Sequence, residues 1–150
     1  MEIVKKLLII LALGVSLLAN DIIVKESNCS VDETVDNLKN IVRSKGLSIF
    51  AVINHQGNAK QVDMKLNESK MLIFGNPKLG TSLMQQDMKV GLDLPLRILV
   101  YVDSDSKVKM AYRDGSWLAN KHILNAPKKL QKMNKAMENI TTRAGQCKKD

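Results

Sequence analysis

The sequence predicts a single α+β domain, an antiparallel sheet with helices packed on one face. Two observations indicate this class. Amphipathic helical segments flank a middle region of short apolar segments with strand character, so the order is β-α-β, a β-rich middle and then α. Strands in that middle region follow one another closely, as in hairpins. At 150 residues the chain is long enough to bury one core.

The first elements of the domain are a short strand and a well-marked helix. Residues 21–25 (DIIVK) read as the strand. Ser30 and Glu33 have the spacing of a capping box, in which each side chain satisfies a free backbone amide at a helix start. Apolar residues then recur at helical spacing, and Gly46 is placed to end the helix. This set is Val31, Val35, Leu38, Ile41 and Val42.

The middle of the chain alternates strands with turns. Residues 47–55 (LSIFAVINH) are rich in β-branched side chains and predict a strand, whereas residues 56–67 fit either a short helix or a loop. A strand over 71–74 leads into the turn Gly75-Asn76-Pro77. We expect Thr81 or Ser82 to cap a helix that ends near Gly91.

Pro95 then stands at the start of a strand over 96–103. A hairpin turn over 103–106 and a return strand over 107–112 follow. The acidic turn lacks the central Gly and terminal Glu of a calcium-binding EF-hand loop. We expect a short helix after Ser116 to carry Trp117 and His122.

The last predicted element is a basic amphipathic helix over 127–143. Pro127 suits its first turn, and its apolar stripe is Leu130, Met133, Met137 and Ile140. From Lys121 onward, Lys and Arg far outnumber the acids Glu138 and Asp150. Such a run is typical of a solvated helix face, and it can also attract an anionic membrane surface. No nucleic-acid partner is expected, since an exported protein rarely meets DNA and the few aromatic residues argue against base stacking.

The N-terminus predicts export. Lys5 and Lys6 precede an apolar run, Leu7 to Leu18, which has the length of the core of a signal peptide and is too short to span a bilayer. Cleavage near Ala19 would leave a periplasmic or secreted domain over residues 20–150. The alternative is an uncleaved membrane anchor.

The two cysteines fit an oxidising compartment. Cys29 and Cys147 lie near opposite ends of the mature domain and form no Cys-x-x-Cys motif, which disfavours a zinc knuckle or a thioredoxin-like redox site. Together they could close one long disulfide loop. The alternative is two free or separately placed thiols, because pairing geometry cannot be read from a sequence.

Several spaced motifs resemble the family catalogued as domain of unknown function 302. The motifs are Phe74-Gly75-Asn76-Pro77, Gly80-Thr81, Leu83-Met84, Leu92-Asp93-Leu94-Pro95, Tyr112, Asp114, Leu118-Ala119 and His122. The resemblance also takes in Thr34 and His55 and covers about residues 22–124. It implies a curved antiparallel sheet similar to the TATA-binding-protein-like class and a homodimer, but no activity. The chain departs from the family pattern at Asn54, usually acidic, and at Arg113-Gly115, usually Asn-Asp-Pro.

The two histidines are the candidate metal ligands. His55 and His122, brought together with Asp93 or Asp114, could bind a transition metal or a haem iron. The alternative is that each histidine is a capping or packing residue. The predicted pocket lies between the Phe74–Pro77 turn, the Leu92–Pro95 corner and the histidines. Its candidate ligand-binding residues are His55, Phe74, Asn76, Asp93, Tyr112 and His122.

These features favour an exported binding module for a small molecule, a metal or haem, with no particular cofactor indicated. An enzyme with His55 or His122 as general base is the competing class, although no nucleophile elbow, Cys–His signature or paired carboxylates accompany them. A third class is an envelope-interaction protein that uses the basic C-terminal helix. Asn76 and Asp93 also have a purely structural interpretation, as residues that bond their own backbone in turns.

Overall fold

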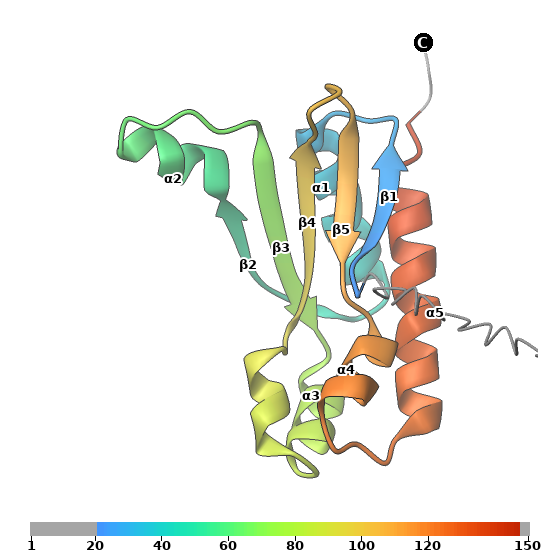
Figure 1. Cartoon of the computed structure of the whole chain (residues 1–150). Coiled ribbons are helices and arrows are strands. Elements are labelled where there is room, and N and C mark those ends of the chain that lie inside the picture. Colours follow the sequence, from blue (N-terminus) through green and yellow to red (C-terminus); the bar gives the residue numbers. More distant parts are fainter. Residues whose placement is uncertain (1–20, 148–150) are drawn as a thin grey trace, which may run out of the picture.

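The computed structural model describes residues 21–147 and forms one α+β domain (Figure 1). Five antiparallel strands form a sheet in the order β1-β5-β4-β3-β2. The strands are β1 (Ile23–Ser27), β2 (Ser48–Asn54), β3 (Ser69–Gly75), β4 (Leu96–Val102) and β5 (Val108–Tyr112). The predicted signal peptide and its cleavage near Ala19 lie outside the described residues. Within them, no helix is both long and apolar enough to cross a membrane.

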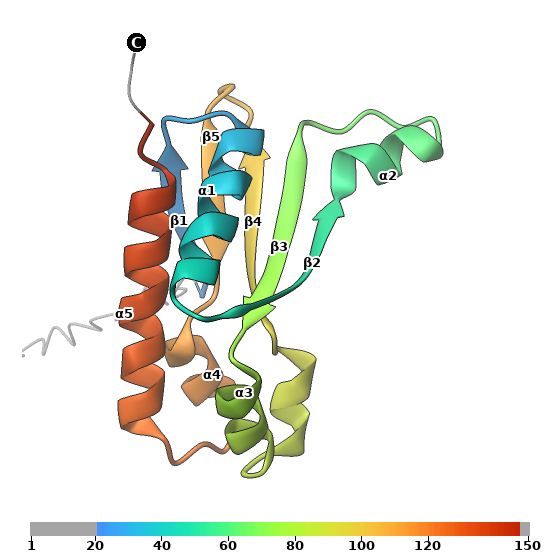
Figure 2. The ribbon, with the colours of Figure 1, turned by 180° about the vertical axis from the view of Figure 1, so that it is seen from behind.

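Two long helices, α1 (Val31–Ser44) and α5 (Pro127–Ala144), pack side by side on one face of the sheet (Figures 1 and 2). Alternate residues of the central strands point toward them, so Leu72, Phe74, Ile98, Val100 and Met110 are fully buried. From the helices, the core receives Leu38, Val42, Met137 and Ile140. Among residues 21–147, no helix crosses the centre of the opposite face of the sheet (Figure 1).

The capping predictions for α1 are confirmed. Ser30 Oγ accepts the Glu33 amide at 3.2 Å, and the Glu33 carboxylate accepts the Ser30 amide at 2.9 Å. Gly46 follows the helix with φ of 68°. This left-handed conformation is unfavourable for residues that have a Cβ, so glycine suits the position. The predicted final helix, starting at Pro127, is also present.

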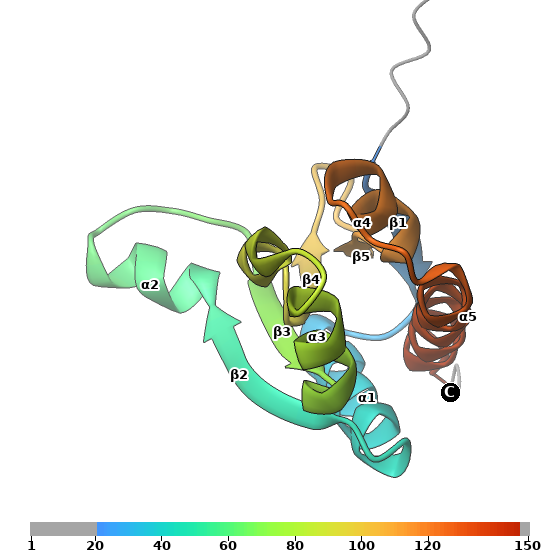
Figure 3. The same ribbon diagram turned by 90° about the horizontal axis from the view of Figure 1, so that it is seen from below.

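The remaining helices are short and lie at the two ends of the sheet (Figures 1 and 3). At one end are α3 (Pro77–Met84), the 3-10 helix η1 (Met88–Leu92) and α4 (Gly115–Lys121). At the other end, α2 (His55–Gln61) follows β2, so the segment over 56–67 begins as a helix.

One helix prediction was wrong. Neither Thr81 nor Ser82 caps a helix that runs to Gly91; α3 starts at Pro77, with Asn76 as its cap, and ends at Met84. The Asn76 Oδ1 accepts the Leu79 amide at 3.1 Å, and proline at the first helical position loses no hydrogen bond. The first strand was also misplaced, because it runs over Ile23–Ser27 and not 21–25.

The cysteines form the Cys29–Cys147 disulfide, which confirms the paired alternative. It joins the start of α1 to the segment after α5, across 118 positions of sequence. Hydrogen bonds reinforce this junction: the Asn28 amide donates to the Gly145 carbonyl at 2.9 Å, and the Cys147 amide donates to Asn28 Oδ1 at 2.6 Å. The segment after α5 is therefore held to the connection between β1 and α1.

Candidate functional site

A small apolar pocket lies between the turn and the corner that the sequence singled out. Its volume is about 190 Å³, and it is lined by the Gly75–Pro77 turn and by Leu94 and Pro95. Most of the remaining wall is apolar and is formed by Phe50, Leu79, Met84, Leu96 and Met133. Asn76 lines it, but its side-chain oxygen caps α3. Phe74 belongs to the buried core, and neither histidine lines this pocket.

A larger and more polar pocket lies on the other side of the Leu96 side chain. This Trp117 pocket has a volume of about 270 Å³. Apolar side chains from the helix-free face of the sheet, including Met71, Leu99 and Ala111, form its floor. Charged side chains from three separate segments converge on it, together with the indole of Trp117. They are Asp93, Arg97, Arg113 and Asp114.

The two arginines are held beside this pocket by specific contacts. Arg97 Nη2 donates to the Leu92 carbonyl at 2.8 Å, which fixes the strand β4 side chain against the end of η1. The Arg113 guanidinium lies 4.6 Å from the centre of the Trp117 ring, within cation–π range. A guanidinium has five N–H donors, and these contacts leave further donors on both side chains for a ligand.

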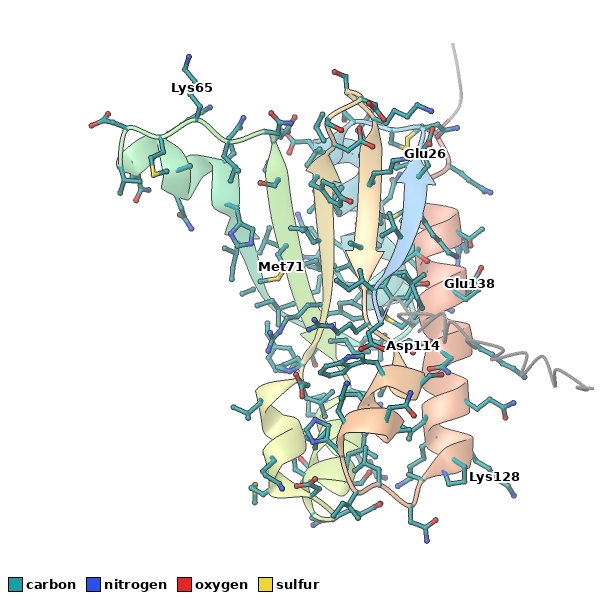
Figure 4. All side chains as sticks on the ribbon, viewed as in Figure 1. Glu26, Lys65, Met71, Asp114, Lys128 and Glu138 are labelled. Atoms are coloured by element: carbon teal, nitrogen blue, oxygen red, sulfur yellow. A yellow bond between two sulfur atoms is a disulfide. The ribbon has the colours of Figure 1, made fainter. Side chains whose placement is uncertain are left out.

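Asp114 has a structural role at the same pocket. Its Oδ1 accepts the amides of Ser116 at 2.9 Å and Trp117 at 3.3 Å, so it caps α4. Asp114 (labelled in Figure 4) comes two residues after Tyr112, the last paired residue of β5. By capping α4 close to the sheet, it fixes the direction in which Trp117 projects.

His122 lies between two carboxylates. Its Nε2 is 2.6 Å from Asp93 Oδ2, and its Nδ1 is 3.5 Å from Asp87 Oδ2. The His122 side chain is only 8% exposed, and its ring meets Trp117 edge-on with 6.4 Å between ring centres. The sequence-based pairing of His122 with Asp93 is therefore present in the structure.

Asp87 connects His122 and Asp93 to the segment that follows α4. Its Oδ2 accepts the Ile123 amide at 3.2 Å, and its Oδ1 accepts the Lys89 amide at 3.1 Å. The bond from Ile123 is the main reason that the pKa of Asp87 lies below its ordinary value. Together with His122, Asp87 joins the two ends of η1 to the end of α4.

His55 occupies a different place. It is the first residue of α2 and lines an open hollow with Leu66, Leu99 and Tyr101. Asn54, at the position where the family pattern is acidic, caps α2 by accepting the Gly57 amide at 2.8 Å. Residues 21–147 contain no group of three or more His, Cys, Asp or Glu placed to hold a metal ion. Metal ligation by His55 and His122 stays a prediction.

Tyr112 is the remaining predicted site residue. It lines the Trp117 pocket while 4% of its surface is exposed, and this burial raises the pKa of its phenol. The sequence reasoning missed Asp87, Arg97 and Arg113. Arg97 had a visible signal, because it interrupts the apolar run of β4 at an outward-facing position. Asp87 and Arg113 had none without the tertiary contacts.

Comparison with known proteins identifies the class of domain. A family profile described as "Domain of unknown function DUF302" matches residues 23–140. The chain belongs to this family, which confirms the resemblance in its motifs. A solved structure described as an uncharacterized conserved protein DUF302 from Bacillus stearothermophilus has a TM-score of 0.73 and 15% identity. The match covers 84% of this chain and 99% of that one, and it shows that the two share a fold.

Two similar relatives have a name that refers to ion transport. "Fluoride-specific ion channel FluC 1" of Brucella suis biovar 1 is 37% identical over 109 residues, which cover 73% of this chain and 43% of the relative. A protein of the same name from Brucella abortus biovar 1 is 37% identical over 109 residues, covering 73% of this chain and 40% of the relative. The chain thus spans about two fifths of the length of the curated relatives it matches.

Proposed function

We propose that this protein is an exported binding module whose small ligand occupies the Trp117 pocket. The observation that carries the proposal is the convergence of Arg97, Arg113 and Asp93 over an apolar floor beside an indole ring. Binding sites for small molecules typically combine apolar walls with a few polar groups that fix the orientation of the ligand. The pocket volume of about 270 Å³ suits a small molecule.

The charged groups indicate the chemistry of this ligand. The two guanidinium groups favour a carboxylate or another anionic group, because charge-assisted hydrogen bonds are the stronger ones. The apolar floor of the pocket favours a ligand whose remaining part is apolar; this floor includes Met71, Leu99 and Ala111. An amphipathic carboxylate of a few carbon atoms meets both requirements.

An enzyme is the second candidate function. The 2.6 Å contact between His122 and Asp93 has the form of a general base held by an orienting carboxylate. However, the second ring nitrogen of His122 faces Asp87, and the side chain is almost covered. Neither nitrogen is directed at a substrate position, which favours binding over proton transfer by His122.

Two further proposals concern the location and the class of the fold. The Cys29–Cys147 disulfide supports export, because such bonds persist in oxidising compartments. The curvature of the sheet around α1 supports the TATA-binding-protein-like class (Figure 3). We do not assign the channel activity named for the Brucella relatives to this chain, because the match covers only about two fifths of the length of those relatives. We propose that the matching region is an accessory binding domain there.

A thermal-shift panel tests the binding proposal. The probes are octanoate and benzoate as amphipathic carboxylates, with Zn²⁺ and haemin for the metal hypothesis. A carboxylate at a hundredfold excess over its Kd would stabilise the fold by about 2.7 kcal/mol and raise Tm measurably. Arg97→Gln should reduce this shift, whereas Arg43→Gln, an exposed arginine on α1, should leave it unchanged.

The outcomes separate the candidate functions. A carboxylate-dependent shift that Arg97→Gln removes supports the proposal, and no shift with either carboxylate contradicts it. A shift with Zn²⁺ or haemin that His122→Ala abolishes would support the metal hypothesis in its place.

A further inference from the structure

We propose that the end of the molecule formed by α3, η1, α4 and the start of α5 docks on an anionic phospholipid surface. This α3–α4 end comprises residues 77–97 and 113–132. It lies opposite α2 in Figure 1, and Lys128 marks its α5 side in Figure 4. Two independent properties, charge and exposed apolar surface, coincide there.

The charge of the described domain is concentrated at this end. Residues 77–97 and 113–132 contain eight Lys and Arg against three Asp, whereas the other residues between 21 and 147 contain eleven against ten. The three aspartates are also engaged: Asp87 and Asp93 contact His122, and Asp114 caps α4. Basic residues close to a surface of anionic lipid each strengthen binding to it.

The three most exposed large apolar side chains of the described residues lie at the same end. They are Ile123 at 83%, Leu92 at 77% and Met88 at 71% exposure. Met88 and Leu92 are the first and last residues of η1. The Ile123 amide donates to Asp87, which immediately precedes Met88, so the two segments are joined. Exposed apolar side chains surrounded by Lys and Arg are typical of protein segments that bind at the bilayer interface.

Asp21, the first residue that the structure describes, contacts this end too. The Asp21 carboxylate lies 3.7 Å from Lys121 Nζ at the end of α4. A lipid surface is favoured over a protein partner because an excess of basic residues and the most exposed apolar side chains of the described residues meet at one place.

The opposite end provides a matched control within the same chain. After α2, Val62, Met64 and Leu66 are 64%, 66% and 50% exposed. There, however, Lys60 and Lys65 are balanced by Asp63 and Glu68. Exposed apolar side chains without excess positive charge should contribute little to binding of anionic vesicles.

Vesicle co-sedimentation of the full chain tests the proposal. The vesicles are phosphatidylcholine alone or enriched in phosphatidylglycerol, and all variants keep the same N-terminal segment. Lys89→Gln with Lys128→Gln should weaken partition to the anionic vesicles about 25-fold, at about fivefold for each lysine. Met88→Ser with Leu92→Ser should weaken it at least about tenfold. The control pairs are Lys60→Gln with Lys65→Gln and Met64→Ser with Leu66→Ser.

Binding that requires phosphatidylglycerol, falls with added salt and is lost only in the α3–α4 variants would support the proposal. Equal loss in the control pairs, equal binding to neutral vesicles, or no binding by the wild-type chain would overturn it. Circular dichroism of each variant separates a lost surface from a lost fold, since all the substituted side chains are exposed.

Discussion

The contact between α4 and α5 positions Trp117 at its pocket, and Gly115 packs tightly against α5 in this contact. Gly115 is the first residue of α4, and its amide donates to Asn134 Oδ1 on α5 at 2.7 Å. A Cβ at this position would lie 2.7 Å from the Leu130 carbonyl oxygen and 2.8 Å from Asn134 Oδ1. Because a comfortable contact is about 3.5 Å, Gly115→Ala must push the two helices apart by several tenths of an ångström.

We expect Gly115→Ala to destabilise the fold by about 1–3 kcal/mol, the usual cost of overpacking. In a domain of this size, each kcal/mol corresponds to roughly 4 °C in Tm. Because α4 carries Trp117, the fluorescence of the folded variant should also change.

Gly80→Ala is the matched control in another short helix, α3. Its Cβ would meet only Leu94 Cδ1, at 3.9 Å. Replacing glycine by alanine within a helix is favourable by about 0.5–1 kcal/mol, so this variant should be as stable as the wild type or more so. Urea unfolding of both variants measures the difference. Gly115→Ala with wild-type stability would refute the close packing of α4 on α5.

Three further predictions concern the disulfide and two titrating groups. Reduction of the Cys29–Cys147 bond should lower the free energy of unfolding by up to about 5 kcal/mol in the chain-entropy model, measured by urea unfolding with and without reductant; an unchanged midpoint would contradict the pairing. Asp87 has a lowered pKa, so its contribution to stability is present above its ordinary pKa near 3.8 and is lost as the pH falls through its folded value. The stability gap between wild type and Asp87→Asn should therefore shrink from pH 6 to pH 3, and a constant gap would count against this ionic role. Tyr112 has a raised pKa, so stability should fall as the pH rises above about 10, and Tyr112→Phe should lessen that loss in alkaline melts.

Local signals predicted α1 and α5 well. The α1 helix has a capping box, a regular apolar stripe and a terminal glycine, all of which act within a few residues of sequence. The pairing of β4 with β5 follows equally from a short acidic turn between two apolar segments.

The α3 region was mispredicted because two local interpretations compete. Asn76 and Pro77 suit a turn, but the same pair also suits a helix cap and the first helical position. Packing decides between them: Leu83 on α3 becomes fully buried when the helix begins at Pro77.

The site itself could be predicted only in part. His122 and Asp93 were recognised as candidate residues, but their contact joins positions 29 residues apart in different elements. Asp87 and Arg113 reach the same region through tertiary packing that no spacing pattern encodes. The placement of His55 in a separate hollow likewise depends on α2 forming directly after β2.

The central claim is that a small amphipathic carboxylate binds in the Trp117 pocket. The chain has a single tryptophan, so its fluorescence reports directly on this pocket. Titration with octanoate should produce a saturable change in Trp117 emission, and Arg97→Gln should weaken the apparent Kd by tenfold or more, as expected for a charge-assisted hydrogen bond. Emission that stays constant up to millimolar octanoate, or an unchanged Kd in Arg97→Gln, would contradict the claim.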